Sequence, residues 1–249
     1  MRTIRLTVAY DGTELHGWQY QPDRPTVQGL LMTACARVLG ARVKVVGASR
    51  TDAGVHALRQ VASVSTSASI EPAALGRALN ALLAPAVRVL DAREAPAGFS
   101  ARRSARGKRY AYLIDRGRAA DPFMRRFAWH VPQPIDTGRL AAGLRSLRGK
   151  RDFSAFCAAP GRGHSPVCTL WSARVVTRGR FLLIAVSGDR FLHHMVRNIV
   201  GTVIQMARAG TPLTRLDEIV ESRDRRRAGP TAPAHGLSLL RVLYGPHDG

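Results

Sequence analysis

Residues 4–90 contain extended and helical segments in an order that few folds accommodate. Apolar and polar side chains alternate from Ile4 to Tyr10, which predicts a half-buried strand. The whole pattern predicts strands over 4–10, 42–47, 59–65 and 87–90, and helices over 26–39 and 72–83. This β-α-β-β-α-β order is the split pattern of a ferredoxin-like half.

The remaining residues repeat this order loosely. The pattern predicts strands over 109–114, 169–177, 181–187 and 237–243, and helices over 136–147, 192–208 and 213–222. Small, proline and cationic residues cluster over 96–107, where a boundary between domains is expected. The sequence therefore predicts an α+β protein with an N-terminal half over 1–103 and a C-terminal half over 104–249, each with a mainly antiparallel sheet.

The charge of the chain indicates a polyanionic partner. Its 38 lysines and arginines exceed its 17 acidic residues by 21, and only Lys44, Lys108 and Lys150 are lysine. Arginine can be enriched by the base composition of a genome, but that does not explain the shortage of acids. Neutralising phosphates releases counterions, so nucleic acid is the favoured partner class, and an anionic membrane surface is the alternative.

Several patterns missing from the sequence lead to expectations about the cellular compartment and about metal binding. It has no apolar stretch of about 20 residues and no signal-peptide pattern at its start, so we expect a cytoplasmic protein without membrane spans. Three widely spaced cysteines favour a reducing compartment over a disulfide framework. Cys157, His164 and Cys168 match no familiar zinc spacing, so no metal is expected.

The segment Ala48–Ala57 places one acid on a turn between two predicted strands. Asp52 follows Arg50 by two residues and precedes Gly54 by two. A carboxylate there could face a cleft, kept ionised by the neighbouring guanidinium. The alternative is an ordinary loop, since aspartate and glycine are common in turns.

The segment 192–208 is the most strongly periodic helix. Its apolar residues form one wide buried face, while His193 lies four and His194 three residues before Arg197. These polar residues could form a solvated face. They could instead direct Arg197 into a cleft, with the histidines packed against its base.

Tyr110 and Tyr112 alternate with Arg109 and Ala111 and so point to one face of their strand. Inward tyrosines are usually core residues. However, the basic run 102–109 precedes them, and cations beside aromatic rings on a sheet can hold phosphates and stack bases.

Several of these segments together resemble the tRNA pseudouridine synthase A family. The likeness runs in the family's order from about residue 3 to residue 244, although the stretch 157–168 matches no known motif. The motifs are Asp11-Gly12 with Gly17-Trp18-Gln19, Thr26-Val27-Gln28, Arg50-Thr51-Asp52-Ala53-Gly54-Val55-His56, Phe99-Ser100-Ala101-Arg102, Lys108-Arg109-Tyr110-Ala111-Tyr112, the helix that follows Phe191, and Ala232 to Leu237.

The resemblance implies roles for four residues. Asp52 would be the nucleophile, Arg197 its ion-pair partner and Tyr110 the ring packed on the target base, while Arg50 would help to extrude that base. Asp52 could attack C1′ of the ribose, attack C6 of the base, or remove the C2′ proton. The chemistry adds and removes nothing, so no cofactor is expected.

The resemblance also implies a fold and a substrate. We expect two ferredoxin-like halves whose sheets meet around a central basic cleft, in a homodimer. The expected activity isomerises uridine to pseudouridine at positions 38, 39 and 40 in the anticodon stem-loop of tRNA.

Two other functions stay open. A non-catalytic RNA-binding or chaperone module would use the same cations and tyrosines. A hydrolase of the glycosidic bond would release uracil, but it normally needs a second carboxylate, and none lies near Asp52 in sequence.

Overall fold

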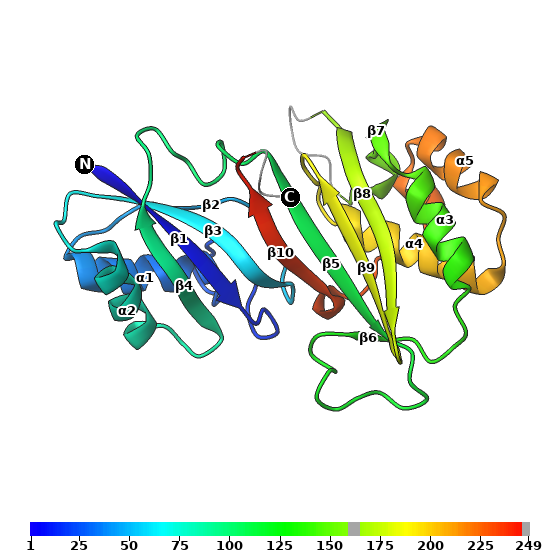
Figure 1. Ribbon diagram of the computed structural model, residues 1–249, viewed down its shortest axis with the longest axis horizontal. Coiled ribbons are helices and arrows are strands. Elements are labelled where there is room, and N and C mark those ends of the chain that lie inside the picture. Colours follow the sequence, from blue (N-terminus) through cyan, green and yellow to red (C-terminus); the bar gives the residue numbers. More distant parts are fainter. Residues whose placement is uncertain (159–164, 246–249) are drawn as a thin grey trace. The chain divides into compact units, whose positions relative to one another are not determined.

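The computed structural model describes residues 1–158 and 165–245 (Figure 1). The chain forms two compact units. Unit 1 contains Met1–Arg106 together with the segment from Ser238 onward, and unit 2 is Gly107–Leu237. Within the described ranges, no helix is both long enough and apolar enough to cross a membrane.

The first 94 residues of unit 1 have the predicted order of strands and helices, and the unit also includes the strand 237–243, which was predicted in the C-terminal half. Its elements are β1 (Arg2–Tyr10), α1 (Val27–Leu39), β2 (Val45–Gly47), β3 (His56–Thr66), α2 (Pro72–Leu82), β4 (Val87–Glu94) and β10 (Leu237–Leu243). The sheet has β1 between β4 and β3, and β2 pairs with β3, all antiparallel. β10 also pairs with β3, in parallel, through Ser238↔His56 and Leu239↔Ala57.

Local capping explains where the helices of unit 1 begin and end. The Thr26 side chain accepts a hydrogen bond from the Gly29 N–H, and Gly40 ends α1 in the left-handed conformation (φ 68°). Glu71 caps α2 in the same way, just ahead of Pro72. The two helices pack against each other and bury their apolar sides over the inward side chains of the sheet, such as Leu6.

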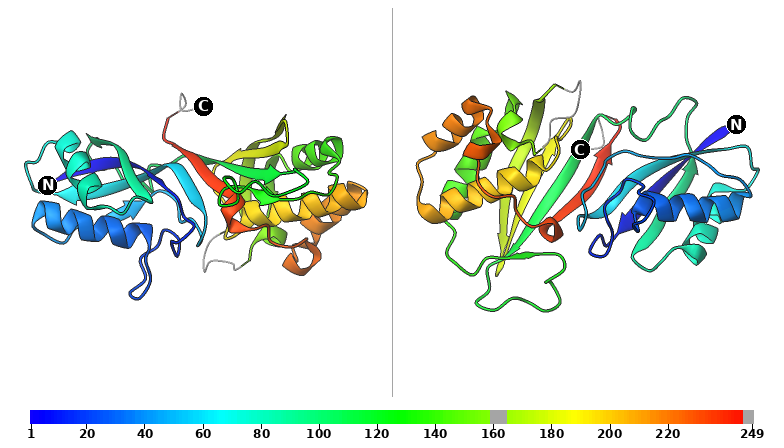
Figure 2. Two further views of the ribbon diagram at one scale, coloured as in Figure 1. Left: turned by 90° about the horizontal axis from the view of Figure 1, so that it is seen from below. Right: turned by 180° about the vertical axis from the view of Figure 1, so that it is seen from behind.

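Unit 2 contains mainly antiparallel strands with helices packed on them. Its elements are β5 (Gly107–Asp115), β6 (Trp129–His130), α3 (Thr137–Ser146), β7 (Gly149–Asp152), β8 (Val167–Arg178), β9 (Phe181–Gly188), α4 (Met195–Ala209) and α5 (Thr214–Ser222), with short 3-10 turns at 154–156, 225–227 and 234–236. The strand order is β5-β9-β8-β7, and β6 adds to β5 in parallel. Figure 2 shows α4 lying along this sheet. The short strands β6 and β7 were not predicted.

The start of α4 differs from the prediction. The helix begins at Met195, because His194 adopts the left-handed conformation (φ 59°) and acts as the N-cap. Leu192, His193 and His194 therefore lie before the helix, and their predicted helical spacing to Arg197 is wrong. The buried face from Met195 to Ala207 is confirmed.

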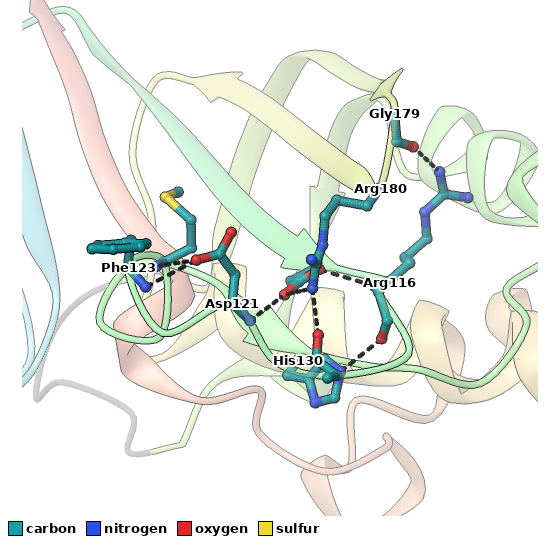
Figure 3. A network of polar contacts seen from close by, with 10 residues as sticks. Arg116, Asp121, Phe123, His130, Gly179 and Arg180 are labelled. Atoms are coloured by element: carbon teal, nitrogen blue, oxygen red, sulfur yellow. Dashed lines mark hydrogen bonds and ion pairs between the residues drawn. The ribbon is translucent and has the colours of Figure 1, made fainter.

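An ion pair between the buried Asp115 and the exposed Arg180 anchors the chain where β5 ends in unit 2. The Asp115 carboxylate accepts hydrogen bonds from Nε and Nη2 of Arg180, at 2.6 and 2.7 Å, and from the N–H groups of Gly117 and Asp121 (Figure 3). Burial by itself raises the pKa of Asp115. The guanidinium and the backbone donors outweigh it and hold that pKa below its usual value.

We expect Arg180→Met to destabilise the protein by about 2 kcal/mol at pH 7. Removing one partner of a buried pair costs about 3–5 kcal/mol, and the partial exposure of Arg180 reduces this. Because folding lowers the pKa of Asp115, its contribution is present above about pH 4 and is lost as the pH falls further. Urea unfolding of wild type and variant should therefore converge at acidic pH. The exposed neighbour Arg178, changed to Met, is the control, and equal midpoints for the two variants at pH 7 would contradict the prediction.

Candidate active site

Asp52 lies on a tight turn between β2 and β3 of unit 1. The Ala48 N–H donates to the Val61 carbonyl, which extends the pairing of the two strands beyond Gly47. The Val55 N–H donates to the Asp52 carbonyl at 3.2 Å, and Gly54 takes a positive φ of 76° that few other residues adopt. Asp52 itself is half-buried. The predicted turn is confirmed.

The end of β1 and the segment after it hold this turn on both sides of Asp52. Thr51 shares a side-chain hydrogen bond with Tyr10 (Oγ1 to Oη, 2.8 Å), and its carbonyl accepts from the Trp18 N–H at 3.0 Å. On the other side, the Gly54 N–H donates to the Leu15 carbonyl at 3.2 Å. The backbone that carries Asp52 is therefore fixed before any substrate binds.

Two glycines permit this close approach. A Cβ on Gly12 would lie 2.1 Å from the carbonyl oxygen of Val55, and one on Gly17 would lie 2.6 Å from that of Thr51. Gly17 also has a positive φ of 83°. The family-like pattern Asp11-Gly12 and Gly17-Trp18 thus has a physical function, which is to bring one backbone segment against another.

Two buried polar residues of β3 complete the support, and neither was singled out from the sequence. The Gln60 side chain accepts from the Ser49 N–H at 3.2 Å and donates to the Ser49 carbonyl at 2.8 Å. The Gly12 N–H donates to Nδ1 of His56, which also lies 3.2 Å from an Asp11 carboxylate oxygen. A polar residue beside an apolar run, as in Gln60-Val61-Ala62, was the available signal.

Arg50 lies on the same turn as Asp52 and is exposed. The structure therefore brings these two sequence-predicted residues together within unit 1. The other two, Tyr110 and Arg197, belong to unit 2.

Tyr110 and Tyr112 share one face of β5 but differ in their surroundings. The Tyr110 ring packs edge-on against Phe191, with 5.1 Å between ring centroids. Tyr112 is fully buried, and its hydroxyl donates to the Pro233 carbonyl at 2.7 Å. Burial raises the pKa of the Tyr112 phenol, although the positive charge of Arg197 opposes the rise. Both tyrosines are buried, and Tyr112 is also bound through its hydroxyl into the core of unit 2.

Arg197 lies in the first turn of α4 and is held by the loop before β10. Its Nε donates to the Ala232 carbonyl at 2.8 Å, and the Ala232 N–H donates to the Arg197 carbonyl at 3.1 Å. This pair of hydrogen bonds holds both the backbone of Arg197 and the Nε of its half-buried guanidinium. His193 and His194, which precede the helix, stack on each other with ring centroids 3.9 Å apart.

A buried amide network fastens that loop to α4. Asn198 accepts hydrogen bonds from Arg225 and Thr231 at 3.1 and 2.6 Å, and its Nδ2 donates to the Phe156 carbonyl. Gly201 faces the loop, and a Cβ there would lie 1.8 Å from the Pro230 carbonyl oxygen. The position of Arg197 therefore depends on residues that lie well away from it in sequence.

The cysteines are placed as buried thiols. Cys157 and Cys168 are both buried, and burial raises the pKa of Cys168 to about 11, which disfavours the thiolate that metals bind. His164, considered with them in the sequence, lies outside the described residues.

The sequence matches a family model described as tRNA pseudouridine synthase over residues 6–102 and 144–245. The tRNA pseudouridine synthase A of Myxococcus xanthus is 41% identical, over 98% of this chain and 92% of the relative. That of Moorella thermoacetica is 42% identical, over 98% of this chain and 100% of the relative. A solved Cbf5-Nop10-Gar1 complex aligns with 94% of this chain and 57% of its own at 11% identity, with a TM-score of 0.39, which is too weak a likeness to bear on the fold.

Proposed function

This chain belongs to the tRNA pseudouridine synthase family, and on that premise we propose that it isomerises uridine to pseudouridine at positions 38, 39 and 40 in the anticodon stem-loop of tRNA. The N1–C1′ glycosidic bond breaks, the uracil turns in the site, and C5 bonds to C1′ while the C5 proton is lost and N1 gains one. The proposal includes a homodimer that acts in the cytoplasm.

Asp52 acts as the nucleophile in this proposal. The observation that supports this role is that Tyr10, Leu15 and Trp18 hold the turn on both sides of Asp52. A fixed backbone keeps the carboxylate in position without reorganisation during the reaction. The net charge of +21 supports the RNA substrate. The step that Asp52 performs is attack at C1′, attack at C6 or removal of the C2′ proton.

The other three residues act on the base and on the charge of Asp52. Reaching C1′ of a paired nucleotide requires flipping it out of the stack at a cost of a few kcal/mol. Arg50, on the same turn, helps to extrude the base, and the ring of Tyr110 stacks on it and recovers about 1–3 kcal/mol. In this proposal Arg197 is the ion-pair partner of Asp52. The pairing and the stacking are predictions from the family resemblance.

The test uses an unmodified tRNA transcript with uridines at 38, 39 and 40, and a matched transcript with cytidines there. Carbodiimide-dependent reverse-transcription stops locate pseudouridine, and chromatography measures free uracil. We expect stops at these positions in the first transcript alone, without uracil release. Pseudouridine at other positions would overturn the assigned positions. Release of uracil would support a hydrolase, and binding without either product would support an RNA-binding module.

A further inference from the structure

A long connection between β5 and β6 is held in one conformation although it has no helix or strand. It runs from Arg116 to Ala128. Connections of more than about 12 residues are uncommon in compact domains unless they have a function or are disordered. This one is fastened at its base by the Asp115–Arg180 pair, by Arg180 on the Ala119 carbonyl, and by a hydrogen bond between Nε2 of His130 and the Gly117 carbonyl at 2.8 Å.

The tip of this loop is organised by Asp121. Its Oδ1 accepts from the N–H groups of Phe123 and Met124, at 2.9 and 3.3 Å, and the Met124 carbonyl accepts from Phe127 and Ala128. The Phe123 ring is nonetheless 89% exposed. Figure 3 shows it on the far side of Asp121 from the Arg180 guanidinium. The structure thus fixes the backbone beneath a large aromatic ring that unit 2 does not cover.

The loop that carries this ring is rich in exposed arginines. Arg118, Arg125 and Arg126 are exposed, and the acid of the loop tip, Asp121, is engaged with backbone N–H groups. An aromatic ring among arginines suits a single-stranded or unpaired nucleotide, whose base stacks and whose phosphates pair with the guanidinium groups. A second copy of this chain would instead bring the same arginines together, and like charges repel.

We propose that the loop 116–128 is an RNA-binding site, in which Phe123 stacks on an unpaired base while Arg118 and Arg125 contact the adjoining phosphates. The inference rests on the proposed function, because it assigns these contacts to the tRNA substrate. Tyr110 lies near the middle of β5, five residues or about 16 Å before Asp115, which is the last residue ahead of the loop. One RNA molecule can therefore span both.

Two variants of the full chain test this site by direct binding of an unmodified tRNA transcript. Phe123→Ala should raise the Kd about fivefold to a hundredfold, as expected for one lost stacked base. The double variant Arg118→Gln/Arg125→Gln should lose two phosphate contacts. The slope of log Kd against log salt concentration should therefore fall by nearly two. The control for Phe123→Ala is Leu90→Ala, which also removes an exposed apolar side chain. The control for the double variant is Arg145→Gln/Arg148→Gln, which removes two exposed arginines in and after α3.

A Kd for Phe123→Ala equal to that of wild type would overturn the inference. So would a smaller sedimenting species for this variant, because the ring would then contact another copy of the chain. Thermal unfolding of each variant, matched to wild type, establishes that a change in Kd is not a loss of folding. If wild type binds the transcript through this loop yet forms no pseudouridine, the proposed function fails and the RNA site stands.

Discussion

Asp52→Asn is expected to lower the rate of pseudouridine formation by about 10³-fold or more, because the amide cannot act as a nucleophile or base. The backbone of the turn is held by Tyr10, Leu15 and Trp18 rather than by the Asp52 side chain alone, so the fold should persist. Affinity for tRNA should stay equal or increase, since a negative charge is removed near phosphates. Single-turnover kinetics with a tritiated uridine transcript, together with a binding assay, measure both quantities.

The matched control is Asp23→Asn, which removes the same charge from an exposed position of unit 1. It should retain the activity of wild type. If Asp52→Asn also retains activity, the nucleophile is another residue. If it loses tRNA binding and activity together, Asp52 supports the fold of the turn rather than the chemistry.

Gly201→Ala is expected to destabilise the protein by about 2–3 kcal/mol and to lower activity by about a hundredfold. The new Cβ would lie 1.8 Å from the Pro230 carbonyl oxygen, so the loop must move away from α4. That movement breaks the paired hydrogen bonds between Ala232 and Arg197. A displacement of about 1 Å at a reacting group can lower a rate about a hundredfold.

Gly143→Ala separates this effect from that of changing a helical glycine as such. Gly143 lies in α3 of the same unit, and a Cβ there meets its nearest atoms at 3.5 Å, an ordinary contact. Alanine should stabilise that helix by about 1 kcal/mol. Calorimetry should therefore place Gly143→Ala above wild type in Tm and Gly201→Ala about 5–10 °C below it. Equal Tm values for the two variants would refute the packing argument.

The sequence predicts the elements of this chain well wherever the signal is local. Alternation and helical periodicity locate the longer strands and helices because burial of one face acts on each residue separately. β6 and β7 are too short to show a period. α4 begins at Met195 because the backbone of His194 is left-handed, which is a tertiary effect. The apolar Leu192 continues the helical pattern, so the sequence predicts a helix that begins too early.

The candidate site is predictable in its residue types but not in its supports. The turn around Asp52 has a motif, whereas Gln60 and His56 act through hydrogen bonds to Ser49 and Gly12, which are distant in sequence. The roles of Asp52, Arg50, Tyr110 and Arg197 stay predictions that the variants above test. The loop 116–128 carries no periodicity, and its order comes from a buried carboxylate that sequence patterns do not reveal.

The pairing of β10 with β3 has a consequence for folding during synthesis on the ribosome. Unit 1 includes the first 106 residues, yet its sheet gains its parallel neighbour at His56 and Ala57 only when Ser238 and Leu239 have been made. Translation is slow compared with local folding, so unit 1 waits with an open strand edge immediately after the turn that carries Asp52. A chain released early would lack that neighbour, and completion of the sheet thus depends on completion of synthesis.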